Sequence, residues 1–568
     1  MPTKPLSDIK IAQKVKKAKI VKIASLLGIN KKYLFTYGDY IAKINLDILG
    51  KIKNKKLGKY ILVTAITPTP LGEGKTVTTI GLAMSLNRVG KLASVCIRQP
   101  SLGPVFGIKG SAGGGGYSQV LPREDFDLHF TGDAHAVGLA HNVAAAFLDN
   151  SIYRENKLNI DIEQIFWRRV VDIGDRVLRN IKIGLGTGTD GVERDSGFDI
   201  TAASEIMAIL ALSKDAKDLR SRLGKIVLAH SKAGKDITTE DIKVAGLMSV
   251  LLKDAIEPNL IQTIEGTPCF VHTGPFANIA HGNSSIIQDR IALALSDYVV
   301  TEAGFGADCG AEKFFDIKCR IGKLKPDAAV IVCSLRALKA HSGICHVTPG
   351  KPLEECLSKD NLPALELGIN NLKKQIENIK IFGVPVVVAV NRFNSDSESE
   401  IKFVKDKAIT FGADFACVSE VWQKGSKGGV DLAKCVIKAA NMPNKFAYLY
   451  PLEASIKEKI ETIAKKIYGA ASVEYSELAE NKIKLYTERG WDKLPVCMAK
   501  TPLSLSHDPQ LKGAPSGFIL PIRDIRVYTG AGFITPLCGS IQTMPGLPSH
   551  PRGENIDINQ EGEIFGLS

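Results

Sequence analysis

Short apolar runs alternate with longer amphipathic stretches along most of the chain. Some runs, such as 386–390 (VVVAV), contain no polar residue, and segments such as 204–212 and 367–381 show apolar residues at helical spacing. A continuous apolar run is typical of a strand covered on both faces, because an exposed face would produce alternation. The pattern predicts an α/β fold with a mainly parallel sheet flanked by helices. Its strands are expected at 60–66, 93–97, 169–173, 268–272, 298–301, 328–334, 384–390 and 415–418.

The ends of the chain follow other patterns. The start predicts one helix at 11–27, and two charged helices are expected at 454–468 and 476–489, before a Gly/Pro-punctuated β-rich tail. A Pro/Gly/Lys-rich stretch at 346–352 and a proline at 443 suggest boundaries. We therefore expect a large domain and two smaller α/β or α+β domains, at 1–360, 361–445 and 446–568.

The formal charge of +13 is concentrated at one end. Residues 1–60 contain 15 Lys, three Asp, and no Arg or Glu, so they carry +12 of it and leave the other 508 residues near neutral. A near-neutral body argues against a broad nucleic-acid-binding face, so no nucleic-acid partner is expected. The lysine-rich arm is either a solvated surface or a site of attraction for an acidic ligand.

Membrane and secreted classes are not favoured by the composition. No apolar run approaches the ~20 residues of a membrane span, and the first 20 residues lack a hydrophobic signal core. The 11 Cys are scattered without a Cys-x-x-Cys pair, which favours reduced thiols over a disulfide framework. A cytoplasmic protein with no membrane partner is expected.

A glycine loop after the strand at 60–66 is the strongest local motif. It reads Thr69-Pro70-Leu71-Gly72-Glu73-Gly74-Lys75-Thr76 and precedes a helical pattern, the context of a P-loop. Glycines let backbone amides approach phosphate oxygens, Lys75 can reach the β- and γ-phosphates, and the Thr76 hydroxyl can hold Mg²⁺. Thr69 stands where the usual pattern has glycine. An ordinary helix-capping turn is the alternative to this nucleotide site.

Other candidate residues follow predicted strands. Arg98 ends the strand at 93–97 and could clamp an anion with two hydrogen bonds, with a surface ion pair as the alternative. The segment 107–117 holds six glycines in eleven residues, as a linker or a backbone-lined pocket. Phe305, Phe393 and Trp422 also follow strands. In a parallel sheet these ends form the ligand-binding edge, where aromatic rings either stack on a ligand or pack.

Several long segments resemble those of formate–tetrahydrofolate ligases. They include TPTPLGEGKT (67–76), RQPSLGPVFGIKGSAGGGGY (98–117), DYVVTEAGFGADCGAEKFFDIKCR (297–320) and PLEASIKEKIETIAKKIYGA (451–470). The resemblance is nearly end to end. It implies a homotetrameric three-domain enzyme that uses formate, Mg-ATP and tetrahydrofolate, with K⁺ or NH₄⁺ as an activator. The reaction would pass through formyl phosphate and yield 10-formyltetrahydrofolate, ADP and phosphate.

The same resemblance assigns roles to residues. Lys75 and Thr76 would serve the phosphates and Mg²⁺, Arg98 would hold formyl phosphate, and Phe305, Phe393 and Trp422 would line the folate site. The domain at 1–360 would then bind the nucleotide, and the one at 361–445 would contribute to the folate site. The acidic polyglutamate tail of folate becomes a candidate ligand for the lysine arm.

Five positions depart from the family pattern. Gln99 replaces a glutamate, and the others are Ser111 and Ser342 for glycine, Asn394 for proline, and Pro502 for glutamine. Loss of the carboxylate at Gln99 could change activity or cation dependence. A catalytically weakened homologue that still binds nucleotide or folate is therefore one alternative, and a ligase with another acceptor is a second.

Overall fold

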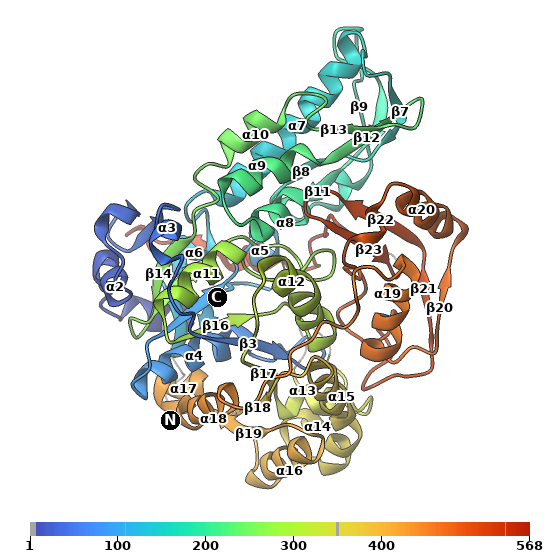
Figure 1. The fold of residues 1–568 in the computed structure, drawn as a ribbon. Helices are drawn as coiled ribbons and strands as arrows, with labels where there is room; N and C mark the ends of the chain where they lie inside the picture. The colour runs from blue at the N-terminus through green and yellow to red at the C-terminus, as the bar shows by residue number, and fades with distance from the viewer. Residues whose placement is uncertain (1–6, 108, 348–351, 540, 568) are drawn as a thin grey trace.

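One large sheet runs through the protein in the computed structural model, which describes residues 7–107, 109–347, 352–539 and 541–567 (Figure 1). Ile108 of the glycine-rich segment and residues 348–351 of the predicted linker lie outside these ranges. The strand order is β1-β2-β14-β15-β4-β16-β3-β17-β18-β19, with β6 on β14 and β5 on β6. The bounds are β1 Leu34–Tyr37, β2 Ile41–Ile44, β3 Lys59–Ala65, β4 Ala93–Ile97, β5 Gly114–Gly115, β6 Ser118–Leu121, β14 Asn259–Thr263, β15 Pro268–Val271, β16 Tyr298–Glu302, β17 Ala328–Cys333, β18 Val386–Asn391 and β19 Phe415–Ser419.

From β15 to β19 along the strand order, every neighbouring pair is parallel, while β15 is antiparallel to β14, which confirms the mainly parallel sheet. Successive side chains of β3 enter two different cores, because side chains alternate between the faces of a sheet. Ile61 and Val63 pack in the core that includes α4 (Lys75–Arg88) and α18 (Val430–Ala440). Leu62 packs in the core that includes α11 (Ile286–Leu295) and α15 (Leu362–Lys380). Both faces are therefore covered, as the apolar runs predicted.

The sheet changes its winding direction at β3. From β3 the chain passes through α4 to β4, two positions away on one side, and later passes from β16 to β17 on the other side of β3. In open parallel sheets, ligands bind at the carboxyl ends of the strands where the order reverses. The glycine loop follows β3 directly, so it lies at this point.

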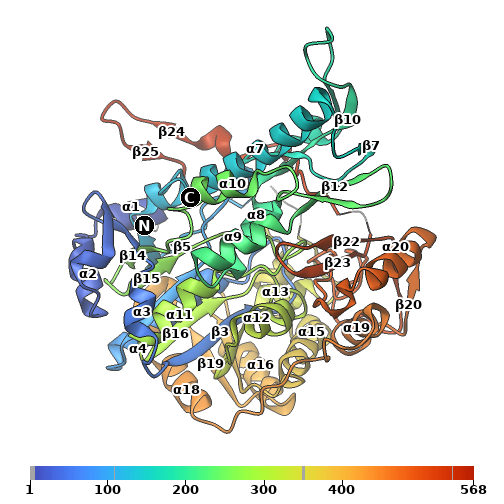
Figure 2. The ribbon, with the colours of Figure 1, turned by 45° about the horizontal axis from the view of Figure 1, so that its top comes forward.

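A separate group of short strands and helices rises above the main sheet (Figures 1 and 2). It contains the three-stranded sheet β13-β12-β7 and the pair β8 and β11. The strand predicted at 169–173 is β8, so placing it in the main sheet was wrong. The bounds are α7 Asp133–Arg154, β7 Ile160–Ile165, β8 Arg169–Val171, β11 Phe198–Ile200, α8 Glu205–Leu212, α9 Ala216–Gly224, β12 Val227–Ser231, β13 Asp236–Thr238 and α10 Ala245–Leu251.

The single N-terminal helix predicted at 11–27 was wrong. The structure has α1 (Asp8–Gln13) and α2 (Ile20–Leu26), separated by a lysine-rich turn. Gln262 of β14 binds the backbone of Ala18 between them, accepting from its N (3.0 Å) and donating to its O (2.7 Å). This tertiary contact, together with the crowding of like charges, outweighs the helical pattern. Among the described residues, no helix is long and apolar enough to cross a membrane.

The predicted boundary near 360 lies between β17 and β18, which are neighbours in one sheet. The sheet therefore continues across it, and the division into three domains stays a prediction. The C-terminal part contains both predicted helical segments and the β-rich tail (Figure 1). Its elements are α19 Ile456–Ile463, π-helix η7 Ala464–Tyr468, β20 Ser472–Tyr475, α20 Glu477–Glu488, β21 Ile519–Ile522, β22 Asp524–Tyr528 and β23 Phe533–Leu537.

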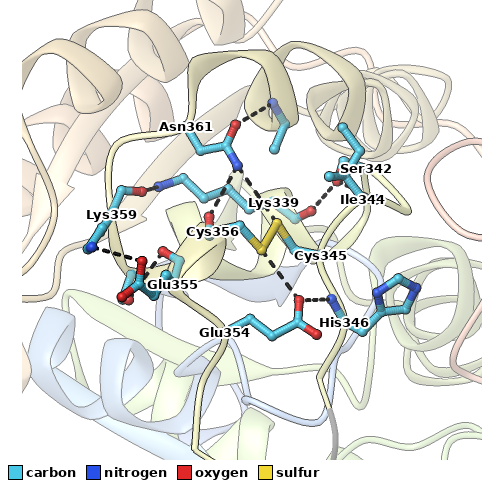
Figure 3. The surroundings of a disulfide bond; sticks show 12 residues. Lys339, Ser342, Ile344, Cys345, His346, Glu354, Glu355, Cys356, Lys359 and Asn361 are labelled. Carbon is cyan, nitrogen blue, oxygen red and sulfur yellow. Dashed lines mark hydrogen bonds and ion pairs between the residues drawn. A yellow bond between two sulfur atoms is a disulfide. The ribbon is translucent and has the colours of Figure 1, made fainter.

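The expectation that every thiol is reduced was wrong. Disulfides join Cys345 to Cys356 and Cys417 to Cys435, and the other seven cysteines are free and buried. Around the first disulfide, Asn361 Nδ2 lies 3.8 Å from the sulfur of Cys345 (Figure 3). The pairs are 11 and 18 residues apart and belong to no spacing motif, so only the folded chain brings them together.

Candidate active site

The glycine loop turns from β3 into α4 at the winding reversal. Gly72 and Gly74 have φ values of +73° and +81°, the left-handed region that glycine adopts without strain. A Cβ at Gly74 would lie 2.5 Å from Nδ2 of Asn391, so this position requires glycine. Residues 69–71 form the turn that precedes them. The predicted strand–loop–helix context is therefore present.

The buried side chain of Glu73 stabilises the glycine loop through hydrogen bonds. Its carboxylate accepts hydrogen bonds from the backbone N (2.7 Å) and Oγ1 (3.2 Å) of Thr69. Burial raises the pKa of Glu73, while nearby Lys75 and these hydrogen bonds oppose the rise. Asn391 Nδ2 donates to the Glu73 carbonyl at 3.2 Å. The threonine that replaces the usual glycine thus takes part in holding the loop's shape.

Three cations and two carboxylates interact at the loop. They are Lys75, Arg98, Lys109, Glu73 and Glu302. Burial lowers the pKa of Lys75 and of Arg98; Glu73 and Glu302 oppose the effect on Lys75, and Glu302 opposes the effect on Arg98. Positive charge in excess of negative charge makes this group of residues suited to an anion.

Glu302 connects the loop to Arg98. Its Oε2 accepts a hydrogen bond from Thr76 Oγ1 at 2.8 Å, and its Oε1 lies 3.9 Å from Arg98 Nη2. Hydroxyl and carboxylate oxygens are ligands that Mg²⁺ prefers. In the part of the chain that the structure describes, no three His, Cys, Asp or Glu residues are grouped to hold a metal. Mg²⁺ would therefore take its other ligands from nucleotide phosphates and water.

Arg98 keeps part of its hydrogen-bonding capacity free. Its Nη1 donates to the Pro275 carbonyl at 3.1 Å, while its buried Nε has no partner among the described residues. A guanidinium with an unused donor next to the glycine loop is suited to a planar or tetrahedral anion. The neighbouring Gln99 is only 7% exposed, and its backbone N donates to the Thr273 carbonyl at 2.7 Å.

The three aromatic residues lie on segments that follow parallel strands. Phe305 has a φ of +61°, a strained value for a bulky residue that is common at functional sites. The ring of Phe393 lies 4.3 Å from the guanidinium carbon of Arg336. Trp422, in α17 (Val421–Lys424), is 40% exposed. Its indole lies next to the glycine-rich segment, where a Cβ at Gly116 would collide with it.

Hydrogen bonds involve three of the atypical residues. Asn394 Oδ1 accepts from Gln423 Nε2 at 2.6 Å, which joins the segments of Phe393 and Trp422. Ser111 Oγ donates to the Asp127 carboxylate, and Ser342 Oγ donates to the Lys339 carbonyl at 2.5 Å. Pro502 lies in the loop that leads to β21.

Lys109 and Glu302 were missed as site residues from the sequence. Both stand in the segments that carry the resemblance, and Glu302 ends a strand beside β3. That position at the ligand-binding edge was the available signal for Glu302. The roles of the predicted site residues themselves stay predictions.

Comparison with known proteins identifies the family that the sequence segments resemble. Residues 6–568 match the family model described as formate–tetrahydrofolate ligase. A protein of that name from Roseiflexus sp. (strain RS-1) is 55% identical over 563 residues, covering 99% of this chain and 100% of the relative. Another from Desulforamulus reducens is 53% identical over 561 residues, covering 99% of each. The chain therefore belongs to the formate–tetrahydrofolate ligase family and is a ligase.

Proposed function

We propose that this protein ligates formate to tetrahydrofolate with ATP, through formyl phosphate, and releases 10-formyltetrahydrofolate, ADP and phosphate. The observation that carries the proposal is the meeting of the glycine loop, Arg98 and Glu302 at the winding reversal of the sheet. A family match along almost the whole chain supports the same substrates.

In the first step, a formate oxygen attacks the γ-phosphorus of ATP and the bond from phosphorus to ADP breaks. Negative charge on the phosphoryl oxygens is stabilised by Lys75 and by backbone N–H groups at the start of α4. Bound Mg²⁺ would neutralise part of the charge on the nucleotide phosphates, and Thr76 and Glu302 supply oxygens that suit it. Phosphorylation gives the unreactive formate carbon a good leaving group.

In the second step, the folate amine nitrogen attacks the formyl carbon. The bond from carbon to the phosphate oxygen breaks, phosphate leaves, and the nitrogen loses its proton. Arg98 would stabilise the charge that develops on the non-bridging oxygens. Phe305, Phe393 and Trp422 would bind the aromatic parts of the folate by stacking.

Further properties belong to the proposal. They are activation by K⁺ or NH₄⁺, a homotetramer and a cytoplasmic location. No observation favours a weakened homologue over an active ligase.

The decisive experiment measures ADP release with formate and tetrahydrofolate supplied together and singly. Release that requires both substrates, with 10-formyltetrahydrofolate formed in equal amount, is the expected result. Scrambling of the β,γ-bridging oxygen of ATP with formate alone would report the first step. Absence of product at saturating substrates would contradict the proposal.

A further inference from the structure

Lys109 differs from the other charged groups beside the glycine loop. Within the described residues it forms no ion pair, and its Nζ lies 5.3 Å from the centre of the Phe305 ring. An ammonium at this distance is attracted to the face of an aromatic ring. The cation therefore covers a ring that the proposed function gives to folate.

The surroundings of Lys109 disfavour its charged form. Partial burial of the ammonium, together with repulsion from Arg98 and Lys75, lowers the pKa of Lys109 to about 8. Glu302 is the carboxylate that opposes this effect, and it already bonds Thr76 and faces Arg98.

An anion bound beside Lys75 and Arg98 would change this balance of charges. A bound phosphate offers charged oxygens to all three cations, and a charge-assisted hydrogen bond is stronger than a contact between a cation and a ring. Lys109 lies between Gly107 and Gly110, and glycine has the greatest backbone freedom. The ammonium can therefore turn from the ring toward the phosphate.

We propose that Lys109 leaves the face of Phe305 when a phosphate binds beside Lys75 and Arg98, and so uncovers the ring for tetrahydrofolate. This inference rests on the proposed function, because it takes Phe305 as a folate contact. It adds a coupling between the two substrate sites that passes through one side chain. By linkage, phosphate and folate then strengthen each other's binding by the same factor.

The test measures the dissociation constant of tetrahydrofolate by calorimetry, with and without ADP plus inorganic phosphate. In the wild type, ADP and phosphate should tighten tetrahydrofolate binding by about fivefold or more. In Lys109→Ala, tetrahydrofolate alone should bind more tightly than to the wild type, because the ring is already uncovered, and the coupling should vanish. Lys109→Arg keeps the charge and should keep the coupling.

Lys217→Ala, an exposed lysine on α9, is the matched control and should behave as the wild type. The inference is overturned if Lys109→Ala keeps the wild-type coupling, or if the wild type binds tetrahydrofolate with no coupling. Failure of the wild type to bind tetrahydrofolate at all would instead overturn the proposed function together with the inference. Calorimetry of ADP binding to each variant reports whether the nucleotide site is intact.

Discussion

Glu302 is the carboxylate that links Thr76 of the glycine-loop motif to Arg98. Glu302→Gln keeps a hydrogen-bond acceptor for Thr76 but removes the charge that balances Arg98 and that, in the proposed function, would attract Mg²⁺. We predict that kcat falls about 100-fold, while the affinity for ADP without Mg²⁺ changes little. Steady-state ADP release and calorimetry measure the two quantities.

The matched control is Glu265→Gln. That carboxylate binds Ser426, whose hydroxyl also accepts from Arg88 at the far end of α4. The Glu265→Gln variant should keep kcat within about threefold of the wild-type value, because this carboxylate lies at the end of α4 away from the glycine loop. A similar kcat for Glu302→Gln and the wild type would show that Glu302 has no part in the reaction.

Gln99 offers a second test, because the family resemblance predicts a glutamate at this position, next to Arg98 in the chain and only 7% exposed. At such a buried site a negative charge attracts a monovalent cation strongly. We predict that Gln99→Glu lowers the half-activating K⁺ concentration by about fivefold or more. K⁺ should also raise its unfolding temperature more than that of the wild type. Equal responses to K⁺ and Na⁺ in the variant would contradict this role.

Lys75 and Arg98 could be predicted as candidate site residues, Lys75 from the glycine-loop motif and Arg98 because it follows its strand directly. Glu302 also stands at the end of a strand, but its partners could not be predicted from that position, and Lys109 had no such signal. The bond from Thr76 to Glu302 spans 226 positions and exists because β16 inserts between β3 and β4. Lys109 depends on a loop whose path no periodic pattern describes. Contacts between residues so far apart in the sequence can be identified only from the folded structure.

At the scale of elements, the parallel strands were predictable because both of their faces are apolar. The antiparallel strands β2 and β14 were missed because each contains a buried polar residue that interrupts its apolar pattern. Lys43 of β2 is buried and pairs with Asp133 at 2.8 Å, and Asn259 of β14 donates to the same carboxylate. Buried polar residues satisfied by tertiary partners look like surface residues in the sequence. The apolar pattern therefore reported only part of the sheet.

The start of α8 gives a prediction about pH. The buried Glu205 carboxylate accepts from the backbone N of Gly530 (2.7 Å) and of Ala531 (3.0 Å), and burial raises its pKa to about 7. Between pH 5 and 7 the folded state then holds a proton that the unfolded state has lost, so this group costs stability as pH rises through that range. Glu205→Gln does not titrate and still accepts hydrogen bonds.

Between pH 5 and pH 8, we expect the free energy of unfolding of Glu205→Gln to rise by about 1–3 kcal/mol relative to that of the wild type. Unfolding temperatures measured across this range would show the two curves separating as pH rises. Glu366→Gln, at an exposed carboxylate on α15, is the control and should follow the wild type. Parallel curves for Glu205→Gln and the wild type would contradict the assignment.

At the scale of the whole molecule, the C-terminal part is bonded to the elements behind the glycine loop. Asn371 of α15 accepts from the Thr67 backbone N at 3.0 Å and donates to the Gly513 carbonyl at 2.6 Å. His341 Nε2 bonds the Thr67 carbonyl, at 2.8 Å, and its Nδ1 accepts from Gly513 N at 3.3 Å. A shift of the C-terminal part would therefore displace Thr67, which stands just before the glycine loop.

A buried ion pair holds the same two parts together. Lys500 Nζ lies 2.9 Å from Asp308 Oδ2, and both side chains are at most 1% exposed. Lys500→Met would leave a buried carboxylate without its cation, which costs about 3–5 kcal/mol. We predict a fall of several degrees in the unfolding temperature. In the double variant with Asp308→Asn much of the loss should return, because the uncompensated charge is gone and Gln375 can still bond the new amide. If the double variant is no more stable than Lys500→Met, packing of the lysine stem and not its charge joins the C-terminal part to the sheet.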